Sequence, residues 1–278
     1  MRNFLIFLLF IFLITGCNRT NIFYEYGDII VSWQVDNYFD LTNEQEEWVE
    51  KEMMLLLDWH RIEELPDYKK FLIEIQESAR DGLNMEKINI GFRSYEKKRD
   101  RIINKLLPKV AVFLKGLNSD QIDYLEKKIL KDNLEILENL ENHKDRLIRR
   151  KENFFDQMEN WFGEINEIQI EKLSKWQNQW YKDSYYKSND RMKFRLNSQN
   201  QFLEILRSNP EKNKIEEWLR KWTLSMTSKY DSKRKERILK NKKRILEVFK
   251  ILTNNQRNHL IMELDYWKKI LEETIQNH

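Results

Sequence analysis

The chain has 278 residues, a formal net charge of +3 and 34% charged residues of mixed sign, with only six glycines and three prolines. This composition favours helices with few tight turns and argues against a β-sandwich or a β-barrel. The nearly balanced charge implies no obligatory polyanion partner. We therefore expect an all-α protein, a multi-helix bundle with long, partly extended antiparallel helices.

The N-terminal residues follow the layout of a secretory signal peptide. Arg2 precedes a short apolar run from Phe4 to Ile14, and two small residues then lead to Cys17, the only cysteine. The apolar run is too short for a membrane-spanning helix, which needs about 20 apolar residues.

The segment Ile14-Thr15-Gly16-Cys17 resembles the lipobox of bacterial lipoproteins. The resemblance implies cleavage before Cys17 and attachment of acyl chains, palmitate among them, to that residue. Asn18 stands where Asp would signal inner-membrane retention, so the resemblance implies the outer membrane, facing the periplasm. We expect a signal peptide at 1–16 and one helical domain at 17–278, held on the membrane by covalent lipid on Cys17. The alternative is an incidental cysteine behind an ordinary signal peptide.

Apolar spacing and helix-ending residues divide the rest of the chain. The segment 22–39 is compatible with a strand or a helix, and we favour a helix. Pro66 is expected to restart the chain after a first long helix, and Pro108 to kink a later one. The stretch 118–161 lacks Gly and Pro, which predicts one long helix. In chain order, the predicted helices span 22–39, 42–64, 66–81, 84–116, 118–161, 166–187, 190–207, 210–251 and 253–275.

Four short motifs share an aliphatic residue, then Thr or Asn, then Gln three positions later. A Thr or Asn side chain caps the free N–H groups of a helix start, and Gln at the third helical position can reach back to the cap. The motifs predict that Thr42, Asn118, Asn166 and Thr253 are helix N-caps, with Gln45, Gln121, Gln169 and Gln256 as their partners.

His60 is the candidate for chemistry, because histidine titrates near neutral pH. The alternative is a structural histidine that is hydrogen-bonded near a helix C-terminus. The sequence carries no nucleophile, phosphate-loop or dinucleotide motif, and no second histidine at metal-ligand spacing. We expect no catalytic residue, no cofactor, no metal and no enzymatic activity.

Two further patterns have alternative interpretations. The aromatic residues Trp161, Trp176, Trp180, Trp218 and Trp222 predict core packing or, alternatively, an exposed binding groove. The run 229–250 holds ten Lys or Arg with apolar residues on one face. It predicts either a solvated outer face or contact with anionic lipid head groups. Nucleic acid is not an expected partner of an exported chain.

Nearly the whole mature chain resembles a family of bacterial lipoproteins of unknown function. After Cys17, the resemblance rests on an aromatic-rich stretch, a Leu-x-x-x-Gln helix start, a Trp-His-Arg element leading to Leu-Pro-x-Tyr, and a later Trp-x-Gly element that ends in Gln. The motif positions are Trp59, His60, Arg61, Leu65, Pro66, Tyr68, Trp161, Gly163 and Gln169. The Leu-Thr-x-x-Gln motifs at 41–45 and 252–256 are also similar to those of Spy-type periplasmic chaperones, whereas Asn replaces Thr in the other two.

These features lead to three hypotheses. The first is a non-enzymatic exported lipoprotein that binds unfolded proteins or envelope components, with a holdase as its sharpest form. The second is a membrane-surface tether or envelope scaffold that contacts anionic lipid. The third is an envelope hydrolase that uses His60 and nearby carboxylates.

Overall fold

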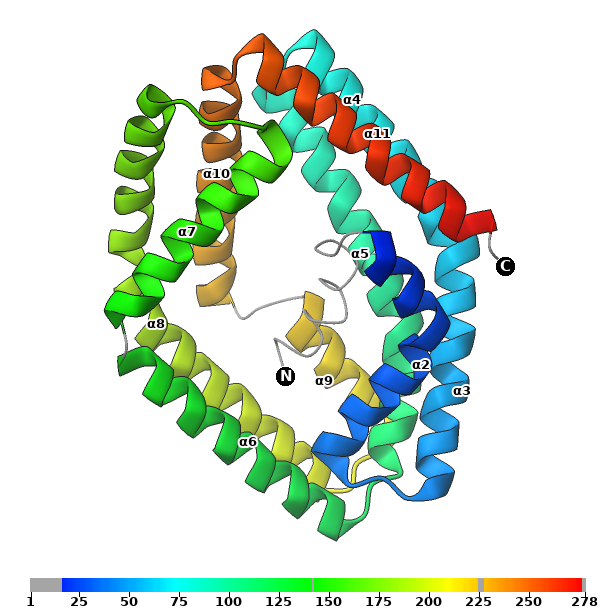
Figure 1. Ribbon diagram of the computed structural model, residues 1–278. Helices are drawn as coiled ribbons and strands as arrows, with labels where there is room; N and C mark the ends of the chain where they lie inside the picture. The colour runs from blue at the N-terminus through cyan, green and yellow to red at the C-terminus, as the bar shows by residue number, and fades with distance from the viewer. Residues whose placement is uncertain (1–16, 142, 225–227, 277–278) are drawn as a thin grey trace.

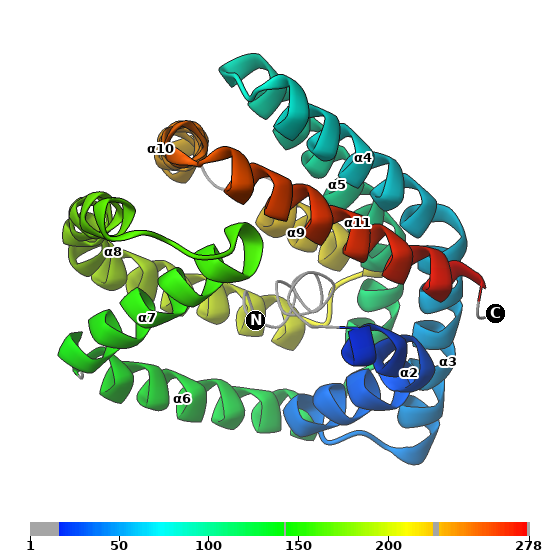
Figure 2. The same cartoon turned by 45° about the horizontal axis from the view of Figure 1, so that its top comes forward.

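The computed structural model describes residues 17–141, 143–224 and 228–276, and every regular element within these ranges is a helix. The all-α prediction is therefore confirmed. Figures 1 and 2 show long helices arranged as an open, elongated frame, in which α4 and α11 lie antiparallel along one side. The segment 22–39 is helical, as we favoured.

The helices follow one another with short connections. In chain order they are α2 (Cys17–Phe39), α3 (Asn43–Trp59), the π-helical turn η2 (His60–Glu64), α4 (Leu65–Asp81), α5 (Met85–Lys115), α6 (Ser119–Glu141), α7 (His143–Phe162), α8 (Glu167–Arg207), α9 (Lys212–Leu224), α10 (Ser228–Ile251) and α11 (Asn254–Gln276).

The main hydrophobic core lies where α2, α3, α5, α6, α8 and α9 meet. Phe202, Leu107, Leu125 and Leu219 come from four of these helices and are each 1% exposed. Full burial of such a side chain stabilises the fold by about 1.5–3 kcal/mol. Two smaller clusters hold the other end of the frame together. They centre on Ala79, Phe249 and Leu252, and on Met158, Ile165 and Leu173.

All four predicted N-caps are confirmed. Thr42 and Asn166 each accept the N–H of the Gln three residues later, and that Gln side chain accepts the cap residue's own N–H. Asn118 and Thr253 make the same pair of bonds. Because each box satisfies donors that a helix start leaves free, these local sequences fix where α3, α6, α8 and α11 begin.

The four glutamines also pair with one another, which the sequence did not predict. Gln169 Nε2 donates to Gln256 Oε1 at 2.8 Å and to the Ile251 carbonyl at 2.7 Å. Gln256 Nε2 donates back to Gln169 Oε1 and to the Glu164 carbonyl, both at 2.8 Å. The pair therefore joins the first turns of α8 and α11.

A matching pair joins α3 to α6. Gln121 Nε2 donates to Gln45 Oε1 at 2.6 Å and to the Asp40 carbonyl at 3.1 Å, and Gln45 Nε2 donates to Gln121 Oε1 at 3.2 Å. The spacing within this pair is 76 residues, against 87 in the other. Each capping box thus also works as a tertiary contact between two helix starts.

The expected helix start at Pro66 is confirmed, because Pro66 lies in the first turn of α4, although a π-helical turn and not a loop joins α4 to α3. The η2 turn connects α3 to α4, and the Leu65 N–H bonds to the carbonyl of His60, five residues back. In the first turn of a helix a backbone N–H has no intrahelical acceptor, so the N–H that proline lacks is not missed at this position. A π-helical turn is rare and often marks a functional or packing site.

Three of the predicted helix boundaries are wrong. The stretch 118–161 is not one helix: α6 packs on α2 and α8, whereas α7 turns away and packs on α11 (Figure 1). Conversely, 166–207 is one helix, α8, instead of two. The single helix predicted for 210–251 is two, α9 and α10. Tertiary packing decides these cases, because no Gly or Pro marks them in the sequence.

Glycine follows the last residue of α4, α5 and α7, close to the helix ends predicted at 81, 116 and 161. Gly82 has a φ of 92° after α4, and Gly163 has a φ of 73° after α7. Such backbone conformations are open to glycine at little steric cost. α5 runs on through Pro108 as far as Lys115.

Candidate functional site

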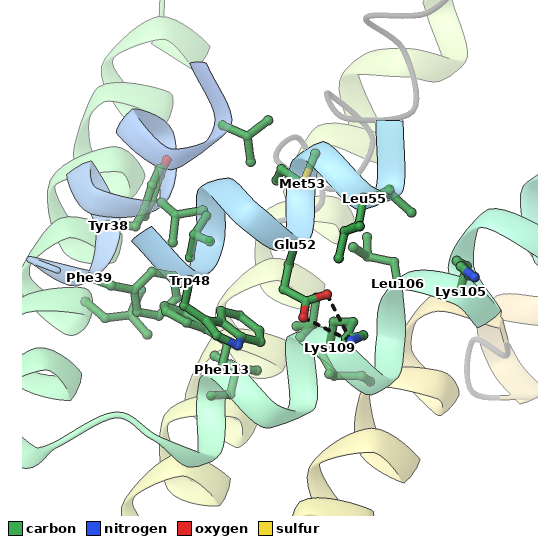
Figure 3. A pocket seen from close by; sticks show the side chains of 18 of the residues that line it. Tyr38, Phe39, Trp48, Glu52, Met53, Leu55, Lys105, Leu106, Lys109 and Phe113 are labelled. Atoms are coloured by element: carbon green, nitrogen blue, oxygen red, sulfur yellow. Dashed lines mark hydrogen bonds and ion pairs between the residues drawn. The ribbon is translucent and has the colours of Figure 1, made fainter. Parts of the chain in front are cut away.

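An apolar pocket of about 420 Å³ lies between α2, α3 and α5 (Figure 3). Its size falls in the usual range for small-molecule or side-chain binding sites. Its floor comes from the main core, including Leu125 of α6, Phe202 of α8 and Leu219 of α9. Nonpolar side chains form nearly all of the lining, so the pocket favours a nonpolar occupant.

Aromatic side chains shape one end of the pocket. Phe113 of α5 meets Phe39 edge-on at 5.1 Å between ring centroids and stacks with Trp48 at 6.3 Å. Figure 3 shows the side chains of Trp48 and Phe113 close together, with Phe39 and Tyr38 to their left. The Tyr38 hydroxyl donates to Asp132 of α6 at 2.6 Å, which fixes α2 against that helix.

The mouth of the pocket carries opposite charges. Lys109 of α5 donates to Glu52 of α3 at 3.0 Å, and Figure 3 shows this ion pair between the two helices. Lys105 lines the same side and lies 5.3 Å from the ring of Trp59. Leu55 completes the rim and is 54% exposed, so one apolar edge of the pocket is open to solvent.

The sequence signal for this pocket was present but ambiguous. Trp48, Val49, Met53 and Leu56 appear in the sequence as the apolar stripe of one helix. Helical spacing shows that such residues share a face. It does not show whether the face is filled by a neighbouring helix or left partly open, and here it lines the pocket.

The Trp-His-Arg element lies beside the pocket as a buried junction of α2, η2 and α4. His60 is 3% exposed, and its Nδ1 lies 2.6 Å from the Tyr24 hydroxyl. Its Nε2 lies 3.3 Å from the Tyr68 hydroxyl. Arg61 donates to the Tyr24 carbonyl at 3.4 Å, and its guanidinium lies 5.1 Å from the Tyr24 ring. The element therefore holds α2 in place.

Burial determines the charge state of this junction. It lowers the pKa of His60 from 6.5 to about 3, so the ring is neutral in the folded protein near pH 7. A neutral imidazole has one donor and one acceptor, which match the two hydroxyls. Burial also raises the pKa values of Tyr24 and Tyr68, so both stay protonated. The interpretation of His60 as a hydrogen-bonded structural histidine agrees with this geometry.

Carboxylates nearby are engaged by an arginine instead of by His60. Arg101 of α5 donates to Glu64 at 2.8 Å and to Asp67 at 2.7 Å. Burial raises the pKa of Glu64 against the opposing effect of Arg101. Arg101 lowers the pKa of Asp67 through its hydrogen bond.

The remaining family-motif positions are spread over two regions. Leu65 is 1% exposed in the main core, next to Pro66. Trp161, Gly163 and Gln169 lie at the other end of the frame, around the turn between α7 and α8. A Cβ at Gly163 would stand 3.4 Å from the His259 ring, so this turn packs closely on α11.

Some of the tryptophans pack in the core, and others line the pocket or are exposed. Trp218 stacks on buried Phe202 at 5.1 Å and on Trp222 at 6.0 Å, which is core packing. Trp48 lines the pocket, and Trp33 is 63% exposed. The side chain of Trp180 lies outside the described residues.

The predicted anchor and the basic run can be placed in part. Cys17 opens α2, whereas residues 1–16 lie outside the described range. In the described part of the basic run, Lys240 pairs with Glu236 at 2.7 Å. Lys242 donates to Asn89 at 2.9 Å and lies over the Phe92 ring, so this part of α10 packs on α5.

Two features are absent from the residues that the structure describes. No group of three or more His, Cys, Asp or Glu side chains there is arranged to hold a metal ion. Nor do the helices in those ranges include one with the length and apolar character needed to cross a membrane.

Comparison with known proteins gave one match. The model of a protein family described as "Family of unknown function (DUF6279)" matches residues 37–214. No curated protein and no solved structure matches the chain. The matched segment includes all nine family-motif positions from Trp59 to Gln169 but neither Cys17 nor the motif at 252–256. The lipobox and the Spy-type likeness therefore stay predictions.

Proposed function

This chain belongs to DUF6279, a family of unknown function. From its sequence and its geometry, we propose that it is an exported lipoprotein that holds apolar segments of other polypeptides. The observation that carries the proposal is the apolar pocket between α2, α3 and α5. Burial of an apolar side chain there would be favourable by about 25 cal/mol per Å² removed from water.

The lining suits side chains of more than one shape. Met53 is unbranched and adapts to irregular partners, and Trp48 and Phe113 offer flat faces. Such surfaces are typical of sites that accept varied peptides. This supports a holdase-like role, in which one site binds many unfolded clients.

The mouth favours a polypeptide over an amphiphile with a single charged head. Glu52 and Lys109 form a paired carboxylate and ammonium there. An anionic head group on Lys109 would leave Glu52 without its partner, and a cationic one on Glu52 would do the same to Lys109. A polypeptide backbone supplies N–H donors and carbonyl acceptors side by side, so it can approach both without separating them.

The four glutamine motifs do not support client binding. Their side chains cap helices and bond to one another, and none of the four lines the pocket. Any holdase activity is therefore expected from the pocket, and it needs no nucleotide because the sequence has no phosphate-binding loop.

We expect Leu55→Glu to weaken client binding by at least about tenfold, because an occupant would bury the new charge at the pocket rim. Leu55 is 54% exposed, so the substitution should leave the fold intact. The measurement is the aggregation rate of an unfolded client at near-equal concentration with the mature chain, starting after Cys17.

Met54→Glu is the matched control. Met54 is 51% exposed on the same helix but does not line the pocket, so this variant should protect the client as well as the unaltered chain does. If neither chain slows aggregation, or if the two variants behave alike, the pocket is not the client site.

The lipoprotein part of the proposal predicts that Cys17→Ser abolishes incorporation of labelled palmitate in cells. The reason is that the lipobox resemblance makes the Cys17 thiol and amino group the acylated atoms. The variant should also leave the membrane fraction or stay unprocessed, because acyl chains provide the anchoring free energy. Unchanged labelling of Cys17→Ser would contradict the assignment.

A further inference from the structure

One face of α2 is apolar and exposed. Tyr26 is 47% exposed, Ile29 55%, Ile30 37% and Trp33 63%. The spacing of i, i+3, i+4 and i+7 places the four side chains on one side of the helix, over about two turns. We call these four residues the α2 outer face.

The α2 outer face lies away from the side of the helix that packs. The opposite side, with Val31 and Val35, lines the pocket and contributes to the main core. At 100° per residue, Val35 lies about 160–180° around the helix from Trp33 and Tyr26. α2 thus carries two apolar surfaces: one is buried in the protein, and the four residues of the other are 37–63% exposed.

We infer that the α2 outer face lies against the lipid surface of the membrane that carries the anchor on Cys17. The inference rests on the proposed lipoprotein function. The argument for lipid as the occupant is continuity with that anchor, because Cys17 opens the same helix. Tyr26 and Trp33 follow Cys17 by about 14 Å and 24 Å along the axis. A helix tethered at its first residue can therefore lie in the plane of the interface with this face down.

The chemistry of the face agrees with an interfacial position. Trp and Tyr are enriched where membranes meet water, because each has an apolar ring and a polar atom. The four residues of the face carry no charge.

The contact would orient the whole protein. An acyl anchor alone leaves the domain free to rotate about one point, whereas a second contact along α2 fixes the direction of that helix. Because Val31 and Val35, on the opposite side of α2, line the pocket, the pocket would face away from the lipid and stay accessible to clients.

The test is site-directed labelling of the acylated protein in vesicles. Cys17 is the only cysteine, and its thiol would be acylated, so a cysteine introduced elsewhere is the only free thiol. An environment-sensitive fluorophore is placed through Trp33→Cys, and through Tyr26→Cys as a second position. The control is Leu134→Cys on α6, since Leu134 is 62% exposed against 63% for Trp33.

In phosphatidylcholine vesicles, quenching by aqueous iodide should be at least about threefold weaker at 33 and 26 than at 134, because interfacial helices sink their apolar face about 5–10 Å into the boundary. In detergent-free protein that starts after Cys17, without vesicles, the three positions should be quenched alike.

Two results would overturn the contact alone. One is equal quenching at all three positions in vesicles when mass spectrometry shows acylated Cys17. The other is protection that needs anionic lipid and is lost in salt, which would point to the basic α10 instead. An unmodified Cys17 would overturn the lipoprotein proposal, and the contact with it.

Discussion

Gln169→Glu is expected to lower the free energy of unfolding by about 3 kcal/mol, because it places a buried carboxylate against two carbonyl oxygens that now accept hydrogen bonds from Gln169. Gln169 is 5% exposed, and its Nε2 donates to Gln256 Oε1 and to the Ile251 carbonyl. Glu has the same shape but no donor there. Its carboxylate oxygen would face two other oxygens, and both contacts would become repulsive.

The same substitution at Gln45 is the internal control. Gln45 occupies the equivalent motif position, but it is half-buried and its donor bond to Gln121 is longer, at 3.2 Å. We expect a loss of about 1 kcal/mol, since water can solvate the new charge. Urea unfolding followed by circular dichroism measures both. Equal losses in the two variants would mean that the Gln169–Gln256 pair is not a specific contact between α8 and α11.

The second prediction is a loss of stability in mild acid that His60 causes. Burial holds the pKa of His60 at about 3 in the folded protein, whereas the unfolded value is near 6.5. Between these values the unfolded chain binds more protons, so the free energy of unfolding falls as pH falls below about 6.5. From pH 7 to pH 5 the expected loss is about 2 kcal/mol.

His60→Gln isolates this contribution. A glutamine amide can bond to the hydroxyls of Tyr24 and Tyr68 but does not titrate. Glu64, whose pKa burial raises, acts in the opposite direction, but it is present in both proteins and cancels in the comparison. The variant should be less stable than the wild type at pH 7 and lose about 2 kcal/mol less on going to pH 5. Parallel pH profiles would show that His60 is solvated or already charged.

The geometry of His60 also bears on the hydrolase hypothesis. General acid–base work requires a side chain within reach of a substrate proton. His60 is 3% exposed and contacts two tyrosine hydroxyls, and Glu64 and Asp67 bond to Arg101. These contacts explain the Trp-His-Arg element as a structural junction that positions α2.

The sequence predicted single elements of the pocket, such as one apolar helix face, but not the pocket itself. The sequence placed Trp48 and Met53 on one helical stripe, and the same spacing is found in any buried helix. Glu52 and Lys109 are 57 residues apart, so nothing local marks them as partners. The exposed side of α2 was likewise hidden, because an apolar residue in a helix is usually buried.

The sequence by itself determined the helical class and the starts of four helices, because a capping box is complete within four residues. It also determined the ends at Gly82 and Gly163, where the backbone needs glycine. Only the tertiary structure decided that α6 and α7 separate, that α8 continues to Arg207, and that the capping glutamines meet in pairs. Each of these depends on contacts between residues far apart in the chain, whose free energy exceeds the small differences in local helix propensity.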